Sequence, residues 1–256
     1  MIEEITPLII TFDEAPNIQR ALDRLVWAKR IVVIDSGSTD GTLEILRSYP
    51  QVVAIHRPFD DFASQCNFGL QQVQTPWVLS LDADYELSAE LVDELGKLEP
   101  DEATAGFRAR FIYRIFGRPL RGSLYPPRVV LYRRDRASYV NAGHGHRVTI
   151  SGDVGWLTEE IYHDDRKPLS RWFASQQRYA VREAEYLLSL SRSELRAFDR
   201  IRRVGWLAPV IAPLHALIIK GCILDGWAGW YYALQRLLAE AMIALEIIDR
   251  RLRRNG

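Results

Sequence analysis

The sequence predicts an α/β fold in which a Rossmann-like mixed sheet carries helices on both faces and is followed by a C-terminal amphipathic helical extension. Three observations support this prediction. Short apolar segments alternate with helix-like segments in the first part of the chain, as in parallel sheets with crossover helices. β-like segments broken by Gly and Pro come next, and the last part is amphipathic. We expect one domain over residues 1–165 and a helical extension over residues 166–256.

The individual elements are predicted from apolar spacing. Four segments are typical of buried strands, namely residues 7–12, 30–35, 52–55 and 77–81. Helices are predicted at residues 15–28, from 38–40 onward, at 61–73 and at 88–98, where Ser88 is the cap. Residues 107–113, 128–132 and 147–150 indicate an antiparallel extension. Residues 169–190, 193–203 and 204–252 are predicted to be helical.

The charges are unevenly distributed although they balance overall. The chain has 33 basic and 33 acidic residues, so its net charge indicates no nucleic-acid partner. Residues 166–256 contain 16 Lys and Arg against 8 Asp and Glu, whereas residues 1–165 contain 17 against 25. We therefore expect the first part to hold the chemistry and the last part to contact an anionic surface.

Cysteine usage and hydropathy indicate the compartment. Cys66 and Cys222 are far apart and lack metal-ligand spacing, which argues against a disulfide framework or zinc site and fits a reducing compartment. The first residues include acids where a signal peptide has basic residues. Residues 204–224 approach the length of a membrane span, but Lys220 and two prolines interrupt them. We expect a cytoplasmic protein without a full span.

Polar residues follow three of the predicted strands. Residues 12–14 follow the first, residues 35–38 the second and residues 82–84 the fourth. Because ligands of open α/β sheets bind beyond the carboxyl ends of the strands, we expect one crevice to collect all three segments.

Asp82 and Asp84 form a candidate metal site. They stand at alternate positions at a strand end, so the chain must turn before both can face one cation. Mg²⁺ and Mn²⁺ take oxygen ligands and commonly combine one or two carboxylates with substrate phosphates. The alternative is an acidic loop that caps the next helix.

The segment VVIDSGSTDGT is a candidate nucleoside site. Asp35 ends a buried strand, and the small residues after it let a ligand approach the backbone closely. Residues 38–41 also suit a helix N-cap, so we assign Asp35 to binding and Asp40 to capping.

The segments ITFDEAPNI, VVIDSGSTDGT and LDADYEL resemble, in order and spacing, the signatures of family 2 glycosyltransferases of the GT-A fold. The resemblance implies a nucleotide-sugar donor, with UDP-sugar favoured, and a divalent metal, Mn²⁺ or Mg²⁺, on its diphosphate. The donor and metal roles that it implies fall on Thr11, Phe12, Glu14, Asp35, Asp82 and Asp84.

Two segments depart from the family pattern. Asp13 stands where the family usually has Asn, which is expected to alter one local hydrogen bond. In Gln65-Cys66-Asn67 a Cys replaces a basic residue. Gln65 and Asn67 remain candidates for donor binding, and Cys66 is assigned to the core.

A second cluster could complete the metal site or supply a general base. His163 is a candidate metal ligand, and Asp164 and Asp165 are candidate bases, with His146 as the alternative base. In an inverting transfer the base takes the proton of the acceptor hydroxyl while its oxygen attacks the anomeric carbon opposite the leaving nucleotide. Arg128 could bind phosphate. The alternatives are a helix-capping surface turn, structural histidines and an ordinary surface arginine.

The C-terminal part indicates the acceptor side. HDDRKPLSRW and KGCILDGWAGW are similar to segments of bacterial family members that build lipopolysaccharide cores, which implies a lipid-linked acceptor at the inner face of the cytoplasmic membrane. Trp206, Trp227 and Trp230, beside a basic tail, suit an interfacial helix. A homo-oligomer interface and plain core packing are the alternatives.

Together these features predict an inverting, metal-dependent glycosyltransferase, peripheral or monotopic at the inner membrane, that glycosylates a lipid-linked acceptor such as lipopolysaccharide core. Two alternatives stay open. One is a polyprenyl-phosphate glycosyltransferase, whose acidic acceptor needs no strong base. The other is a catalytically inactive scaffold that binds nucleotide sugars or glycans.

Overall fold

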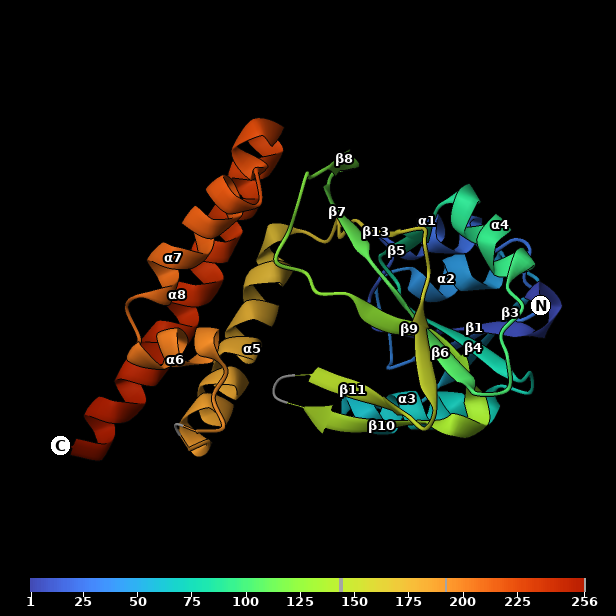
Figure 1. The fold of residues 1–256 in the computed structure, drawn as a ribbon, viewed down its shortest axis with the longest axis horizontal. Helices are drawn as coiled ribbons and strands as arrows, with labels where there is room; N and C mark the ends of the chain where they lie inside the picture. The colour runs from blue at the N-terminus through green and yellow to red at the C-terminus, as the bar shows by residue number, and fades with distance from the viewer. Residues whose placement is uncertain (143–144, 192, 256) are drawn as a thin grey trace. The chain divides into compact units, whose positions relative to one another are not determined.

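The computed structural model describes residues 1–142, 145–191 and 193–255 (Figure 1). The chain forms two compact units, one of residues 1–116 and 125–166 and one of residues 117–124 and 167–256. Residues 117–124, which the sequence analysis placed in the first domain, group with the helical unit.

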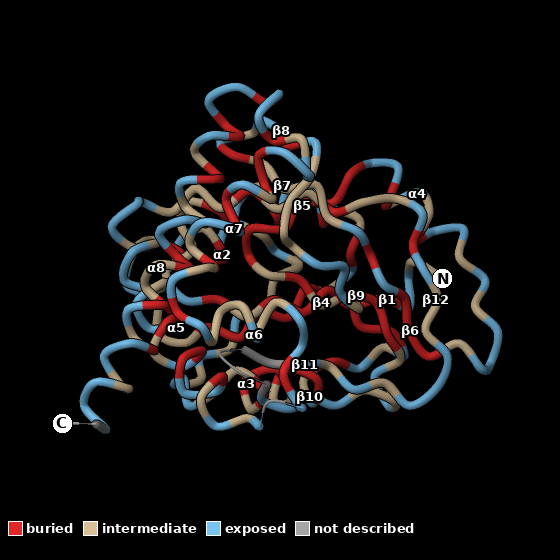
Figure 2. The backbone as a smooth tube through the Cα atoms, turned by 60° about the vertical axis from the view of Figure 1, so that its left-hand side comes forward, coloured by how far each residue is buried: buried red, intermediate tan, exposed pale blue. Residues whose placement is uncertain are grey.

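A seven-stranded sheet forms the centre of the first unit, in the order β12-β6-β9-β4-β1-β2-β3. Its strands are β1 (Ile5–Thr11), β2 (Ile31–Asp35), β3 (Val52–His56), β4 (Trp77–Asp82), β6 (Thr104–Ala109), β9 (Arg128–Arg133) and β12 (Asp153–Trp156). β3, β2, β1 and β4 are parallel neighbours, whereas β9 runs antiparallel to β4 and β6. The sheet is therefore mixed, as predicted, and it contains much of the buried backbone (Figure 2).

Apolar side chains cover both faces of this sheet because alternate residues of a strand point to opposite sides. Ile31 and Val33 of β2 belong to one hydrophobic cluster, and Val32 and Ile34 belong to another. The first cluster contains buried residues of α1 (Ile18–Asp23), α2 (Thr42–Arg47) and α4 (Ala89–Lys97). The second contains buried residues of α3 (Phe62–Gln72). The prediction of helices on both faces is confirmed.

The helix starts are set by local hydrogen bonds. Asp61 caps α3 by accepting from Ser64 N at 2.9 Å, and Ser88 caps α4 by accepting from Leu91 N at 3.0 Å. Asp40 accepts a 3.2 Å hydrogen bond from the backbone N of residue 42, the first residue of α2. Two short 3₁₀ helices, η1 (Ile2–Glu4) and η2 (Arg134–Arg136), begin without a side-chain cap.

Smaller strands lie beside the central sheet. β13 (Ile161–His163) pairs antiparallel with β5 (Tyr85–Leu87) and parallel with β7 (Phe111–Ile115). β10 (Ala137–Ala142) and β11 (Gly145–Ile150) form an antiparallel pair next to α3.

The second unit is mostly helical. It contains β8 (Arg118–Pro119), α5 (Leu169–Ser189), α6 (Ala197–Val204), α7 (Ala208–Leu214), a π-helical turn η3 (His215–Ile219), a 3₁₀ turn η4 (Cys222–Asp225) and α8 (Trp227–Asn255). The helical prediction over residues 204–252 is thus interrupted, because Gly221 and Gly226 have φ angles of 73° and 62°. None of the described helices has the length and apolarity needed to cross a membrane.

Candidate active site

Polar strand ends meet at one edge of the central sheet. β2, β1 and β4 are parallel neighbours, with Thr11 in register with Asp35 and Ile10 in register with Asp82. The loops after these strands therefore leave the same edge of the sheet, because carboxyl ends of parallel strands point the same way.

The Asp35 carboxylate organises the loop after β2. It is 1% exposed; its Oδ1 accepts from the backbone N of Gly37 and of Ser38, each at 2.9 Å, and its Oδ2 accepts from Ser38 Oγ. The loop borders a cavity of about 570 Å³ that also contacts His56 at the end of β3. This volume is typical of small-molecule sites. The sequence analysis missed His56, although the strand-end rule could have found it.

The loop after β1 is tied to the loop after β2. Asp13, at a left-handed φ of 52°, accepts from Thr39 N at 2.6 Å, and its own N donates to Ser38 Oγ at 2.7 Å. The carboxylate thus provides an acceptor that an Asn carbonyl would also provide. Thr11 is 2% exposed and its Oγ1 has no hydrogen-bond partner among the described residues, whereas Phe12 is 50% exposed.

Gln65 and Asn67 of α3 contact the protein itself. Gln65 Nε2 donates to Ser36 Oγ at 2.9 Å and to the Arg57 carbonyl at 3.0 Å. Asn67 Nδ2 donates to the Tyr139 carbonyl and Asn67 Oδ1 accepts from Tyr139 N, both at 2.9 Å. These amides hold the loop after β2 and strand β10, so the contacts present here are positioning contacts.

Backbone pairing places His163 beside Asp84. β4 ends at Asp82, the chain turns, and β5 then pairs with β13 so that Tyr85 lies opposite His163. Asp164 N donates to the Asp84 carbonyl at 3.1 Å. As a result His163 Nε2 lies 3.2 Å from Asp84 Oδ2. The cluster that the sequence analysis proposed as a completion of the metal site therefore lies beside Asp84.

Three tyrosines surround the His163 ring. The ring centroids of Tyr113 and Tyr125 lie 4.6 Å from that of His163, and the centroid of Tyr85 lies 5.3 Å away. Burial, followed by the negative charge of Asp82, raises the pKa of Tyr85 and of Tyr125 above the usual tyrosine value. These phenols stay neutral. They pack around the imidazole ring, and its Nε2 atom faces Asp84.

The side chains at this site fit a hard divalent ion whose coordination shell is completed by substrate oxygens. No three His, Cys, Asp or Glu within the described residues form a closed metal cage. Mg²⁺ characteristically takes one or two carboxylates and fills its shell with phosphate oxygens and water. Asp84 and His163 would hold the ion, since adjacent octahedral ligands stand about 3 Å apart. The Asp82 side chain is 49% exposed, and Arg128 Nη1 lies 3.9 Å from its Oδ2.

The two candidate bases differ in accessibility. Asp164 is fully buried, and its Oδ2 accepts from Arg166 Nη2 at 2.7 Å and Nε at 3.0 Å. Asp165 is partly exposed, and its Oδ1 accepts from Asn17 Nδ2 at 2.9 Å. Only Asp165 of this pair can meet an acceptor hydroxyl without rearrangement. The side chain of His146 lies outside the described residues.

Asn17 is a site residue that the sequence analysis quoted without a role. It is 1% exposed, and its Nδ2 donates to Glu14 Oε2 at 2.8 Å as well as to Asp165. Its Oδ1 accepts from Arg166 N at 2.8 Å and from Arg20 Nη2 at 3.1 Å. One amide thus links the loop after β1 to the segment after β13.

Arg20 of α1 also forms hydrogen bonds with this region. It donates to the Asp164 carbonyl at 2.6 Å, and its Nε donates to Glu86 Oε1 of β5 at 2.7 Å. No motif of the sequence pointed to Arg20 or Glu86, because their partners are distant along the chain.

The fold and the site together define an α/β enzyme whose candidate site lies beyond the carboxyl ends of parallel strands. Residues 7–153 match the family model described as glycosyl transferase family 2, and the chain belongs to this family. The protein is therefore a glycosyltransferase, and the GT-A fold expected from the sequence is confirmed.

Individual relatives agree with this assignment. A glycosyltransferase of Rickettsia bellii is 28% identical over 201 residues, which cover 73% of this chain and 68% of the relative. The lipopolysaccharide core biosynthesis glycosyltransferase LpsC of Rhizobium meliloti is 32% identical over 139 residues, about half of each chain (51% and 48%). A mannosyltransferase of Pyrobaculum calidifontis, solved with GDP-Man and Mn²⁺, has a similar fold, with a TM-score of 0.53 and 16% identity over 94% of this chain and 87% of its own.

Proposed function

We propose that the protein is an inverting, metal-dependent glycosyltransferase that transfers a sugar from a nucleotide-sugar donor to a lipid-linked acceptor. The observation that carries the proposal is the pairing of β5 with β13. It brings the Asp84 carboxylate within 3.2 Å of His163 Nε2 and places Asp165 two residues further along the same segment. This proximity supports a diphosphate-binding end and a base in one site.

The donor is assigned to the loops after β1, β2 and β4. The cavity beside Asp35 has room for a nucleoside, and Arg128 provides a cation beside Asp82 for the diphosphate. Mn²⁺ or Mg²⁺, when bound, would neutralise the charge that develops on the leaving diphosphate. UDP-sugar is our first choice of donor; the GDP-Man in the Pyrobaculum enzyme makes a GDP-sugar the next one to test.

The base is assigned to Asp165. Its carboxylate accepts the proton of the acceptor hydroxyl while that oxygen forms the new bond to the anomeric carbon. The bond from that carbon to the diphosphate oxygen breaks on the opposite face, which inverts the configuration. Asn17 and Arg20 hold the segment that carries this base.

The acceptor is assigned to a lipid-linked glycan of the lipopolysaccharide core class at the cytoplasmic face of the inner membrane. The name of the relative LpsC and the exposed apolar side chains of the helical unit support this assignment.

The test compares Asp84→Asn and Asp165→Asn with the wild type and with Asp93→Asn, which changes an exposed carboxylate of α4. UDP-, GDP-, CMP- and dTDP-sugars are supplied with Mn²⁺, and nucleotide release and thermal stabilisation by the matching nucleotide are measured. We expect Asp165→Asn to lose about 10²–10⁴-fold in turnover with nucleotide stabilisation intact. Asp84→Asn is expected to lose the metal-dependent stabilisation, and Asp93→Asn to match the wild type.

Other outcomes would decide between the alternatives. Full activity of Asp165→Asn on a polyprenyl-phosphate acceptor would favour the enzyme that needs no strong base. Nucleotide stabilisation without turnover of any donor would favour the binding scaffold and overturn the proposal.

A further inference from the structure

Helix α8 exposes apolar side chains along its whole length. Six of them, spaced three, four or seven residues apart, are Trp227, Trp230, Leu234, Leu238, Leu245 and Leu252, with exposures between 37% and 67%. This spacing places them along one side of an α-helix. A soluble helix normally presents polar residues on its solvent side, so this stripe lacks the expected polarity.

One charged residue of the same helix, Glu240, is buried instead. Glu240 is 4% exposed and accepts from Arg202 Nε of α6 at 2.8 Å, and Arg202 Nη1 lies 3.3 Å from Glu183 Oε1 of α5. The helical unit therefore keeps an ion-pair network inside while leucines of α8 face outward. Leucines on the outside of a helix that already buries a second apolar side are expected where the outer surroundings are apolar.

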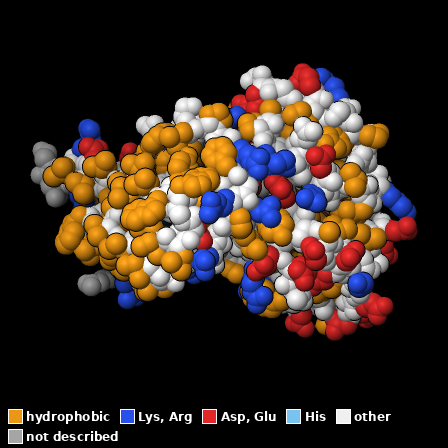
Figure 3. Space-filling model, turned by 90° about the horizontal axis from the view of Figure 1, so that it is seen from above, with side chains coloured by type: hydrophobic (Ala, Val, Ile, Leu, Met, Phe, Trp, Pro, Cys, Tyr) orange, Lys and Arg blue, Asp and Glu red, His pale blue; other side chains and the backbone are white. Residues whose placement is uncertain are grey.

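The preceding elements extend the apolar surface. Val210 and Leu214 of α7, Ile218 and Ile219 of η3 and Leu224 of η4 are between 50% and 72% exposed. α7 packs along α8, and hydrophobic side chains gather over the helical unit in Figure 3. We call these five residues and the six of α8 the exposed apolar face.

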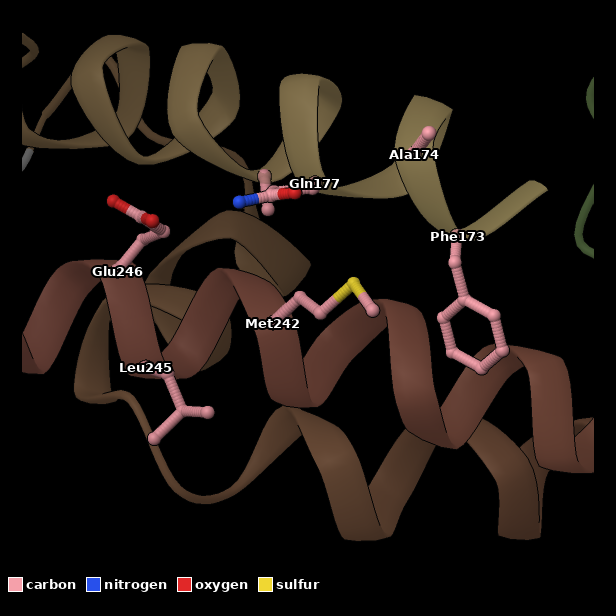
Figure 4. Close-up of a pocket in the computed structure, with 7 residues that line it drawn as sticks. Phe173, Ala174, Gln177, Met242, Leu245 and Glu246 are labelled. Carbon is pink, nitrogen blue, oxygen red and sulfur yellow. The ribbon is translucent and has the colours of Figure 1, made fainter. Parts of the chain in front are cut away.

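A groove between α5 and α8 adjoins this face. Its cavity of about 530 Å³ lies between Phe173 and Gln177 of α5 and Met242 and Leu245 of α8 (Figure 4). Leu245 belongs to both the groove and the exposed apolar face, so the apolar surface continues into the groove.

The positive charge of the helical unit favours an anionic partner for this face. The helical unit contains 17 basic and 8 acidic residues, a net charge of +9. A second copy would bring two strongly positive units together, whereas anionic lipid headgroups complement the charge. Trp206, which is 67% exposed, and the two tryptophans of α8 add the side chains typical of the boundary between lipid and water.

We propose that the exposed apolar face is a lipid-docking surface that lies in the headgroup region of an anionic bilayer. It deepens the proposed function and rests on it in one respect, because a lipid-linked acceptor requires the enzyme to work at such a surface. Contact is peripheral: aliphatic side chains of α7, η3, η4 and α8 enter the acyl boundary, and basic residues such as Lys220 meet the headgroups.

The test is flotation of the full chain with vesicles of phosphatidylglycerol and phosphatidylethanolamine, with phosphatidylcholine vesicles as the neutral comparison. Ile219→Glu and Leu245→Glu change side chains that are 72% and 67% exposed, and Val26→Glu changes one of the first unit that is 69% exposed. Each face variant is expected to lower the partition coefficient on anionic vesicles about tenfold or more, since a carboxylate replaces a side chain that enters the membrane. Val26→Glu should bind as the wild type does.

Donor hydrolysis without vesicles separates this inference from the proposed function. We expect both face variants to hydrolyse the donor at the wild-type rate, because no residue of the exposed apolar face belongs to the candidate active site. If the wild type floats with the vesicles but hydrolyses no donor, the proposed function would be refuted and the lipid-docking inference would stand. Equal flotation of all four proteins would overturn the inference, and so would a dimer that the face variants convert to monomers without any change in flotation.

Discussion

Asn17 shows how a single buried amide can organise the candidate active site. Each of its polar atoms has partners, and those partners come from the loop after β1, from α1 and from the segment after β13. Leaving a buried polar group without a partner costs about 1–3 kcal/mol. The residue therefore contributes to stability and to the orientation of Asp165.

Replacing Asn17 by Ala is expected to lower the free energy of unfolding by about 1–3 kcal/mol and kcat by about tenfold or more. The base would lose the donor that fixes its orientation. Asn67→Ala is the control, because it removes an amide with two hydrogen bonds, against four for Asn17, and contacts no site carboxylate. Urea unfolding and steady-state kinetics measure both effects. An equal loss of kcat in the two variants would speak against a positioning role.

The Cys66 thiol makes stability depend on alkaline pH. Burial, followed by the charges of Asp82 and Asp61, raises its pKa to about 12. The thiol of an unfolded chain ionises near pH 8.5. The folded protein thus holds a proton that the unfolded chain releases, and this stabilisation is complete below about pH 8.5 and is lost as pH rises toward 12.

We expect the wild type to lose about 1 kcal/mol more unfolding free energy than Cys66→Ala between pH 9 and pH 10. The comparison uses the change with pH, so the cavity that alanine leaves does not enter. Urea denaturation at both pH values measures it. Parallel curves for the two proteins would show that the thiol does not titrate in this way.

Among the elements, β13 has the largest influence on the site although it has only three residues. It pairs with β5 on one side and β7 on the other, and the chain leaves it directly into Asp164 and Asp165. The Arg166 side chain compensates the buried Asp164 carboxylate at this exit. The conformation of the segment therefore depends on one ion pair as well as on strand pairing.

Arg166→Ala is expected to destabilise the protein by about 2–4 kcal/mol, because it leaves the Asp164 charge buried without its guanidinium. The lower part of this range allows for the 36% exposure of the Arg166 side chain. Asp164→Asn in the same chain should recover part of the loss, since the amide is neutral. Thermal unfolding of the two single variants and the double variant provides the cycle. Additive losses would exclude the coupling.

The helical elements show where local pattern was sufficient and where it was not. The caps Ser88 and Asp61 begin their helices as their side-chain chemistry predicts. The helix expected at residues 15–28 is confined to Ile18–Asp23. Before it, Asn17 N donates to the Glu14 carbonyl in a turn, and the residues after it form turns that lead to β2. The stretch of residues 204–252 divides where two glycines adopt left-handed conformations.

For the whole molecule, apolar periodicity was enough to predict an α/β fold with helices on both faces of the sheet, and the resemblance of three strand-end motifs to family signatures predicted the GT-A fold and the family. These features are local: a strand of alternating side chains and the residues that directly follow it are contiguous in the sequence. Asp35, Asp82 and Asp84 became candidates for this reason.

The remaining features depend on contacts between residues that are far apart in the chain. Asn17 and Asp165 are separated by 148 positions, and His163 and Asp84 by 79, so no local pattern specifies either contact. The choice between Asp164 and Asp165 follows from burial, which packing sets. The outward leucines of α8 look like ordinary core residues in the sequence, and only the folded chain shows which apolar side of that helix is covered by α5 and α7 and which faces outward.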